Sequence, residues 1–354
     1  MIKKIIILVI VAIAFAGGGY LFVAKKSKAA VEENLARIEL NLEANMPNSD
    51  FTFGRVSTDV FSNTAQVSDL ALKVNGEILV AANLLVISGN ELTLKSAELT
   101  DVEGSIKNSA LDLNYSVNSI LLTDTNTQWV NKLIDEFNVN PVAAIKALND
   151  VSIGELDFRG VSFAADVEGE EVFKLNGEVQ LSGVKNGTLE SLNMAGSIKD
   201  KYGELFGDPI DGSLNSINIT GLDFGNLLTA VAMEDDQLLM AQLQNGFGVS
   251  AVSIEGLVAN ITDAYDDEVK ANLTNATIEI VDSVIKAFSL TDFSFTNEKE
   301  EVAVNIGGAQ FKGLDLGLDF FSEEFLIENT ARFYGLTDIE LNSVSYIVEG
   351  EEFE

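Results

Sequence analysis

One pattern of apolar residues recurs from about residue 50 to the C-terminus. Two apolar residues with one polar residue between them are followed by two polar residues, and the alternation then resumes one position out of phase. The stretch VSIGELDFRGVSF at 151–163 contains two such shifts. Its apolar positions are Val151, Ile153, Leu156, Phe158, Val161 and Phe163. A period of two is typical of a strand with one buried face, and a shift of one position turns that face outward unless the backbone compensates.

The same shift occurs in four other stretches: LTLKSAELTDV at 92–102, INITGLDFGNL at 217–227, FSLTDFSF at 288–295 and IELNSVSY at 339–346. Each polar pair is either a two-residue turn between very short strands, or the site of one extra residue in a continuous strand, a β-bulge. Strands of three residues are too short to be stable, so we favour bulges. Repeated bulges predict a curved, mostly antiparallel sheet with its apolar side chains on the concave face.

The N-terminus contains 20 apolar residues without a charge, at 5–24. As a helix this segment would be about 30 Å long, the thickness of a bilayer core, whereas the apolar region of a secretory signal is shorter. We therefore predict an uncleaved membrane anchor over residues 1–24, with a cleaved signal as the alternative. Apolar residues at helical spacing between 30 and 46 predict a helical stalk over 25–47.

The remaining residues, 48–354, are predicted to form one β-rich periplasmic domain. Helical spacing interrupts the strand pattern, which predicts repeated helix-plus-strand units near 129–165, 226–263 and 321–349. The fold class that we predict is mainly β with α. It has an N-terminal transmembrane helix, then a long curved sheet with bulges, capped by a few short helices.

The composition excludes several kinds of site. The chain has no histidine and no cysteine, so His-based triads, His or Cys metal ligands and thiolate chemistry are impossible. A net charge of -33 argues against nucleic acid as a partner. The densest acidic cluster, DAYDDEVK at 263–270, lacks the spacing of a calcium loop. We therefore expect no enzyme activity, no cofactor and no metal site.

Four segments near the N-terminus resemble a known family. Val56–Phe61, Ala65–Leu72, Ala81–Val86 and Leu92–Gly104 follow one another as strand segments behind the apolar N-terminus. This arrangement resembles the start of AsmA-like envelope proteins and of the related bacterial DUF945 (YdgA-like) family. The later helix-plus-VSIGELDFRGVSF units resemble the second family's C-terminal repeats. The resemblance implies a membrane-anchored periplasmic protein with a long curved sheet and an apolar groove for lipid, and it carries over no catalytic residues.

The function we predict is that of a non-enzymatic, membrane-anchored envelope protein whose apolar concave face binds or carries lipid. The alternative is a structural or scaffold protein of the cell envelope with no open groove. The predicted location is the inner (cytoplasmic) membrane, single-pass, with most of the chain in the periplasm. The predicted partners are that membrane, phospholipid acyl chains and another envelope protein. The candidate groove residues are Ile153, Leu156, Phe158, Ile219, Leu222 and Phe224.

Overall fold

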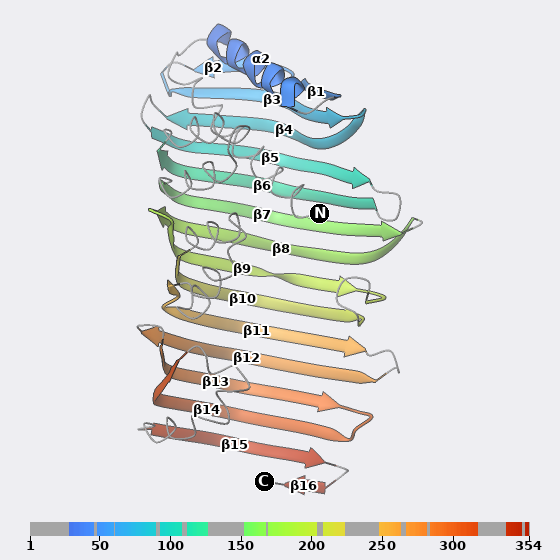
Figure 1. The fold of residues 1–354 in the computed structure, drawn as a ribbon, viewed down its shortest axis with the longest axis vertical. Coiled ribbons are helices and arrows are strands. Elements are labelled where there is room, and N and C mark those ends of the chain that lie inside the picture. Colours follow the sequence, from blue (N-terminus) through green and yellow to red (C-terminus); the bar gives the residue numbers. More distant parts are fainter. Residues whose placement is uncertain are drawn as a thin grey trace. The chain divides into compact units, whose positions relative to one another are not determined.

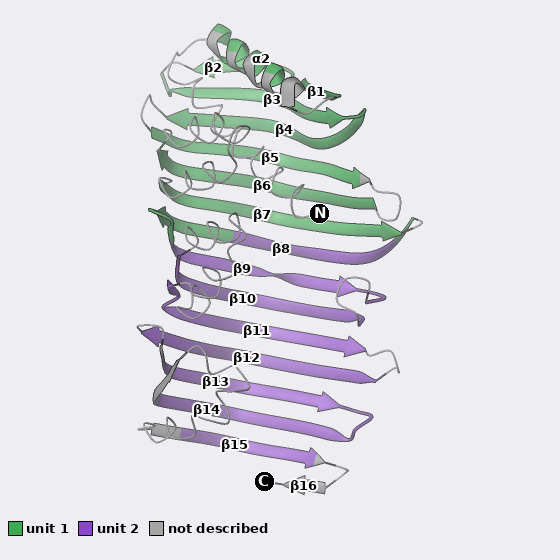
Figure 2. Ribbon diagram, in the orientation of Figure 1, with its two compact units in different colours: residues 1–170, 180–188 green, residues 171–179, 189–354 purple. Residues whose placement is uncertain are grey.

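The computed structural model describes most of the chain, in thirteen stretches. They are residues 28–45, 48–59, 61–89, 93–107, 112–126, 152–167, 169–203, 208–223, 248–262, 267–281, 284–317, 338–348 and 351–353. Within these stretches one helix is followed by sixteen strands, and the recorded strand pairs are antiparallel (Figure 1). The prediction of a β-rich protein is confirmed. The chain divides into two compact units, coloured separately in Figure 2: Met1–Glu170 with Gln180–Thr188, and Glu171–Val179 with Leu189–Glu354.

Unit 1 is an antiparallel meander that begins at a split edge strand. Its elements are α2 (Lys28–Asn45), β1 (Ser49–Thr52), β2 (Val56–Asp59), β3 (Thr64–Val74), β4 (Glu77–Gly89), β5 (Thr93–Lys107), β6 (Asp112–Asn126) and β7 (Ser152–Val167). Strands β1 and β2 both pair with β3, and β3 to β7 then pair in chain order. Asn75 and Gly76, both with positive φ, form the tight turn between β3 and β4.

Unit 2 contains the later strands. They are β9 (Thr188–Asp200), β10 (Ile210–Asp223), β11 (Ala251–Thr262), β12 (Glu268–Val281), β13 (Val284–Asn297), β14 (Val302–Gly317), β15 (Asp338–Val348) and β16 (Glu351–Phe353). Strands β10 to β16 pair antiparallel in chain order. Strand β8 (Glu170–Lys185) contributes residues to both units.

The phase shift in the sequence has a specific structural form in both units. In the β3–β4 pair, Ser68 pairs with Leu84 and Leu70 pairs with Ala82, but Asp69 and Asn83 between them are not paired. We call such residues skipped residues. The register is the same before and after them. The bulge prediction is therefore wrong at these positions, because a bulge would place two residues opposite one. Each strand has its own extra residue, so the apolar face is restored on both strands at once. Bulge-type register shifts do occur elsewhere, for example between Leu72 and Lys73.

The skipped residues form a row across each unit. The skipped row of unit 1 is Asp69, Asn83, Asp101, Asn118 and Gly160. The skipped row of unit 2 is Asn215, Gly256, Thr274, Asp292, Gly307 and Ser343. Along each row, residues with a left-handed backbone, with φ between 47° and 61°, alternate with residues whose φ is negative, which we call ordinary. The left-handed members lie on odd-numbered strands: Asp69, Asp101, Gly160, Gly256, Asp292 and Ser343. Five of these six are Gly or Asp, which tolerate positive φ better than most residues.

The apolar face of unit 1 is closed to solvent across β3 to β6. Residues paired across antiparallel strands share a face, and one such row is Val67, Leu85, Leu99 and Ile120. All four side chains are buried, and Leu85 is fully buried. The next row, on the other side of the skipped residues, contains Leu70, Ala82, Val102 and Val117, which are also buried. The two rows together form a continuous apolar core.

The helix α2 lies against the split edge strand of unit 1. It contacts β1 and β2, and Figure 1 shows it beside these two strands. Val31 and Leu35 are fully buried, whereas Leu40 is exposed. Lys28 and Glu32, one turn apart, form an ion pair at 3.5 Å. The helix thus buries part of one side and carries charges on the rest.

The predictions of a transmembrane helix and of capping helices need correction. No helix in the described part of the chain is long and apolar enough to cross a membrane. The 18-residue α2 would be about 27 Å long, but its charged residues make it unsuitable for a bilayer core. It is also the one helix among the described residues, and it precedes the strands. The predicted anchor at 5–24 and the helical spacing at 129–148, 227–243 and 321–333 lie outside those residues.

The predicted location is corrected for the same reason. A single-pass inner-membrane protein requires a spanning helix, and none of the described residues supplies one.

Candidate functional site

The strands of unit 2 present four apolar rows on one face, which we call the unit 2 apolar face. The rows follow from the strand register and run across β10 to β15. One row consists of Ile217, Ile254, Ala276, Leu290, Ala309 and Leu341. Another, on the other side of the skipped residues, consists of Leu214, Leu257, Leu273, Phe293, Ile306 and Val344. The rows give this face a continuous apolar surface.

The unit 2 apolar face is less buried than the equivalent face of unit 1. Leu273 and Ala276 are buried, but Leu290, Phe293 and Ile306 are only half-buried. At β15 the exposed fractions rise to 57% for Leu341 and 43% for Tyr346. Large apolar side chains that stay exposed in a contiguous set mark a binding surface more often than scattered ones do. The surface is therefore a candidate site for an apolar ligand.

One end of this face is closed by an aromatic contact. The rings of Phe288 on β13 and Phe311 on β14 lie 5.9 Å apart between centroids, and both pack against a small core of Ile280 and Ile285. The register of β12 with β13 shifts next to this cluster, between Glu279 and Ile280. The cluster fixes the strand ends, while the middle of the face towards β15 stays more open.

The predicted groove residues fall into two sets. Ile153 and Leu156 are buried on β7 of unit 1, and Phe158 is half-buried on the same strand. Ile219 and Leu222 are half-buried on β10 of unit 2. Phe224 lies outside the described residues. The two sets belong to different units, so the structure does not bring them together in one described site.

The sequence prediction missed the most exposed part of the apolar face. Leu341, Val344 and Tyr346 lie on β15, and all three are exposed. Their stretch, 339–346, has the same alternation as every other strand, so the apolar pattern alone could not separate it from the core. A usable signal was the dense run of glutamates that follows at 349–354. Such charge is common beside a strand at a sheet edge.

The opposite face of unit 2 is polar and is built from cross-strand ladders. One ladder places Asn218, Ser253, Thr277, Ser289, Gln310 and Glu340 in register. Thr277 and Ser289 share a hydrogen bond at 2.5 Å, and Asn272 donates to Ser294 at 3.3 Å. These groups satisfy each other across the strands. Hydroxyls and amides in this arrangement hold the strands together and supply no nucleophile with a base beside it.

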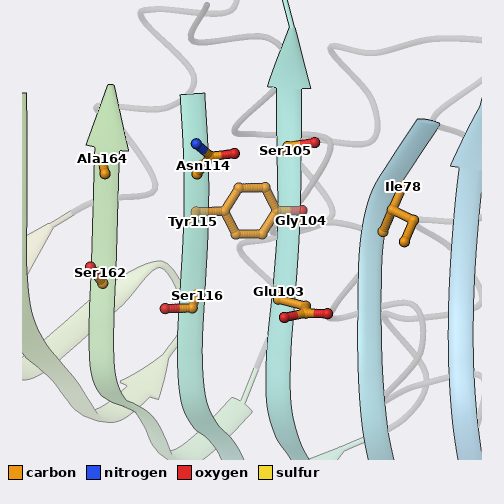
Figure 3. Close-up of a pocket in the computed structure, with 9 residues that line it drawn as sticks. All are labelled: Ile78, Glu103, Gly104, Ser105, Asn114, Tyr115, Ser116, Ser162 and Ala164. Atoms are coloured by element: carbon orange, nitrogen blue, oxygen red, sulfur yellow. The ribbon is translucent and has the colours of Figure 1, made fainter. Parts of the chain in front are cut away.

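Unit 1 has an open hollow of about 340 Å³, shown in Figure 3. Polar side chains of β5 and β6 line it, among them Glu103, Asn114 and Ser116. Glu103 is the only carboxylate among the lining residues, so the hollow lacks the second carboxylate that a general acid–base pair requires.

Gly104 on β5 makes room for the side chain of Tyr115, which lines the same hollow. The ring of Tyr115 extends from β6 across β5 at Gly104, and its hydroxyl donates a hydrogen bond to the carbonyl of Leu79 on β4. A Cβ atom on residue 104 would collide with that ring. Burial raises the pKa of the Tyr115 phenol well above its usual value, so the group stays a neutral donor at physiological pH.

No described group of acidic residues has the arrangement of a metal site. Residues 263–266 of the acidic cluster lie outside the described stretches. Glu268 forms an ion pair with Lys270 at 2.8 Å, and Lys270 also pairs with Glu298 at 2.9 Å. The hydrogen bonds that Lys270 donates to Glu268 and Glu298 raise the pKa of Lys270, and Lys270 lowers the pKa of Glu298. Lys270 thus joins the start of β12 to the turn that follows β13.

Comparisons with known proteins leave the identity of the chain open. No protein-family model, no curated protein and no solved structure matches it. The resemblance to AsmA-like and DUF945 proteins therefore stays a prediction. The residues themselves carry the functional argument.

Proposed function

We propose that this protein is a non-enzymatic lipid-binding protein that holds acyl chains on the unit 2 apolar face. One observation carries the proposal: four apolar rows cross β10 to β15, and their side chains become more exposed towards β15. Acyl chains need apolar contact and no specific polar ligand. A chain without histidine or cysteine can provide such contact with its Leu, Ile, Val and Phe side chains.

The dimensions of the face suit an acyl chain. Six strands at a spacing of about 4.8 Å span about 24 Å from β10 to β15. One leaflet of a bilayer core is about 15 Å thick, half of about 30 Å. An extended acyl chain therefore fits along a row, perpendicular to the strands.

The energetics are also sufficient. Each buried methylene contributes about 0.8 kcal/mol, so ten methylenes contribute about 8 kcal/mol before the costs of ordering are subtracted. A binding free energy of that size corresponds to a Kd of about 1 μM. The half-buried side chains of the face lower the gain, because part of their surface is already covered.

A structural scaffold is the second candidate function, and unit 1 favours it. Leu72, Leu85 and Ile87 are fully buried there, so the apolar face of β3 and β4 leaves little open surface for a ligand. On this alternative, the less buried face of unit 2 would bind another protein and no lipid.

Lipid analysis of the purified full chain distinguishes the two functions. The protein is purified in mild detergent, extracted with organic solvent, and the extract is analysed by mass spectrometry. The proposal predicts phospholipid or fatty acid at a fixed molar ratio, and a lower ratio for Val344→Glu, since Val344 is already exposed and the variant should fold. Absence of lipid above the level in a mock purification would contradict the proposal and favour the scaffold.

A further inference from the structure

The outer edge of β15 is paired over only part of its length among the described strands of unit 2. Its inner edge pairs with β14 along Ala303–Lys312, whereas β16 pairs with its outer edge only from Tyr346 to Val348. No other described strand pairs with the outer edge between Asp338 and Ser345. Backbone N–H and C=O groups along such an edge are a template for another strand.

The skipped row sets a requirement for any strand that joins this edge. In unit 2, the left-handed Gly256, Asp292 and Ser343 each face an ordinary residue on the even-numbered neighbour. Their partners on those strands are Asn215, Thr274 and Gly307, all small or polar. Ser343 has φ 53°. We therefore expect that a strand paired with the outer edge of β15 would place a small or polar residue with ordinary φ opposite Ser343.

The side chains of β15 indicate which residues a strand that joins this edge would carry on each of its faces. Leu341, Val344 and Tyr346 extend the apolar rows to the edge and leave them exposed there. Glu340 and Asn342 lie on the polar face and are exposed. The sequence adds Glu349, Glu351, Glu352 and Glu354 directly afterwards. Opposite charges across a strand pair are stabilising, so a matching strand carries basic residues on its polar face.

We propose that the outer edge of β15 is a docking site for an antiparallel β-strand of a partner protein. The strand has alternating apolar residues, Asn, Thr or Gly opposite Ser343, and Lys or Arg opposite Glu340. It continues both the apolar and the polar ladders of unit 2. This inference rests on the edge of the sheet and is independent of lipid binding to its face.

A second copy of this chain fits the edge less well. Pairing β15 with β15 would bring two acidic strands together, and a register centred on the row would place left-handed Ser343 opposite itself. No described pair in the skipped rows joins two left-handed residues. The other candidate edge of a second copy, β1 with β2, lies against α2.

The test uses a labelled ten-residue peptide and the full chain. The peptide has the sequence of residues 303–312, which already pairs with the inner edge of β15, with lysine in place of Gln310 to face Glu340. Two control peptides carry N-methyl groups on every second amide. In one peptide these are the amides of the odd-numbered positions, and in the other those of the even-numbered positions. Since only one set of amides can face the β15 edge, the proposal predicts micromolar binding by fluorescence anisotropy, at least tenfold weaker for one methylated peptide and nearly unchanged for the other.

Protein variants place the binding on β15. Ser343→Gly keeps the left-handed conformation and should bind like the wild type, whereas Ser343→Val should bind at least tenfold more weakly. Leu341→Lys serves as a second variant, because residue 341 is exposed and the change should leave the fold intact; it should weaken binding as well. Thermal unfolding by circular dichroism verifies that each variant is folded.

Four results would overturn the proposal. They are no binding of the peptide at 1 mM, equal binding of both methylated peptides, binding that neither Ser343→Val nor Leu341→Lys weakens, and dimers of the chain in light scattering that Leu341→Lys abolishes. The last result would assign the edge to a second copy.

Discussion

Asn118 on β6 faces Gly160 on β7, and the side-chain amide of Asn118 occupies the space in which a Cβ atom of residue 160 would stand. Gly160 has φ 60°, a left-handed conformation that glycine adopts without steric cost. The same relationship joins Asn215 and Gly256 in unit 2. In both units, an Asn with ordinary φ thus faces a Gly with left-handed φ at the position where the apolar alternation of both strands shifts by one residue.

Gly160→Ala should destabilise unit 1 by more than the left-handed conformation alone requires. That conformation costs a non-glycine residue about 1–2 kcal/mol. Gly76→Ala is the matched control, because Gly76 has φ 84° and no atom within 4 Å of an added Cβ. Urea unfolding should give a larger loss for Gly160→Ala, since its new methyl group also collides with Asn118.

The double variant Gly160→Ala/Asn118→Ala separates the two causes. Removal of the Asn118 amide relieves the collision but leaves the backbone cost, so stability should recover towards that of Gly76→Ala. Equal losses for Gly160→Ala and Gly76→Ala would show that the Asn118 contact has no steric role.

Asp101 should tolerate Asn better than Ala. Asp101 has φ 51° and accepts a hydrogen bond from the Asn83 amide at 3.0 Å. Alanine loses the hydrogen bond, worth about 0.5–1.5 kcal/mol, and is poorly suited to the left-handed region. Asparagine keeps an acceptor oxygen and tolerates positive φ. Chemical denaturation should rank Asp101→Asn close to wild type and Asp101→Ala clearly below it; the reverse order would contradict the role of the left-handed position.

Tyr115→Phe should cost about 1 kcal/mol at neutral pH, because it removes the hydrogen bond to the Leu79 carbonyl and keeps the ring. The variant should also change the alkaline limb of the stability curve. Burial raises the folded-state pKa of Tyr115 above its ordinary 10.0. The folded protein therefore holds this proton more tightly than the unfolded chain, and stability falls as the pH rises above 10.

The thermal midpoint of the wild type should therefore decline more steeply above pH 10 than that of Tyr115→Phe. Scans between pH 8 and about pH 11 in small steps measure the difference. Parallel declines for the two proteins would show that Tyr115 ionises as freely in the folded state as in the unfolded one.

Lys270→Met should lower the thermal midpoint slightly at neutral pH. Lys270 links Glu268 on its own strand to Glu298, but the three groups are exposed, so the effect is small and screened by salt. The contribution of Glu298, whose folded-state pKa lies below 4.5, is present above that value and is lost as the pH falls through the folded-state pKa. The raised pKa of Lys270 preserves its contribution up to about pH 10.5, and it is lost as the pH rises further.

The difference between wild type and Lys270→Met should therefore shrink in acid and in high salt. Lys95→Met, at an exposed position on β5, is a control for the general loss of one positive charge. A difference that persists at pH 2 would contradict the ion-pair account.

The sequence predicted the β-rich fold from local information. Ile153 and Leu156 lie on either side of a phase shift, and a strand with one apolar face accounts for both. The sequence did not reveal that Asp69 faces Asn83, because the residue opposite each shift depends on strand register. It also could not rank Leu85 against Leu341, since both occupy the same local pattern and differ only in what covers them. The transmembrane helix was predicted from the length of an apolar run and the capping helices from helical spacing, and no described residue outside α2 lies in an α-helix.

Photocrosslinking at paired positions tests lipid binding to the unit 2 apolar face most directly. Benzoylphenylalanine replaces Phe293 on that face, or its neighbour Ser294 on the polar face, and the full chain is irradiated with radiolabelled phospholipid vesicles. The proposal predicts labelled adducts from position 293 and at least fivefold less from position 294. Equal labelling at both positions, or none at 293, would contradict lipid binding on this face.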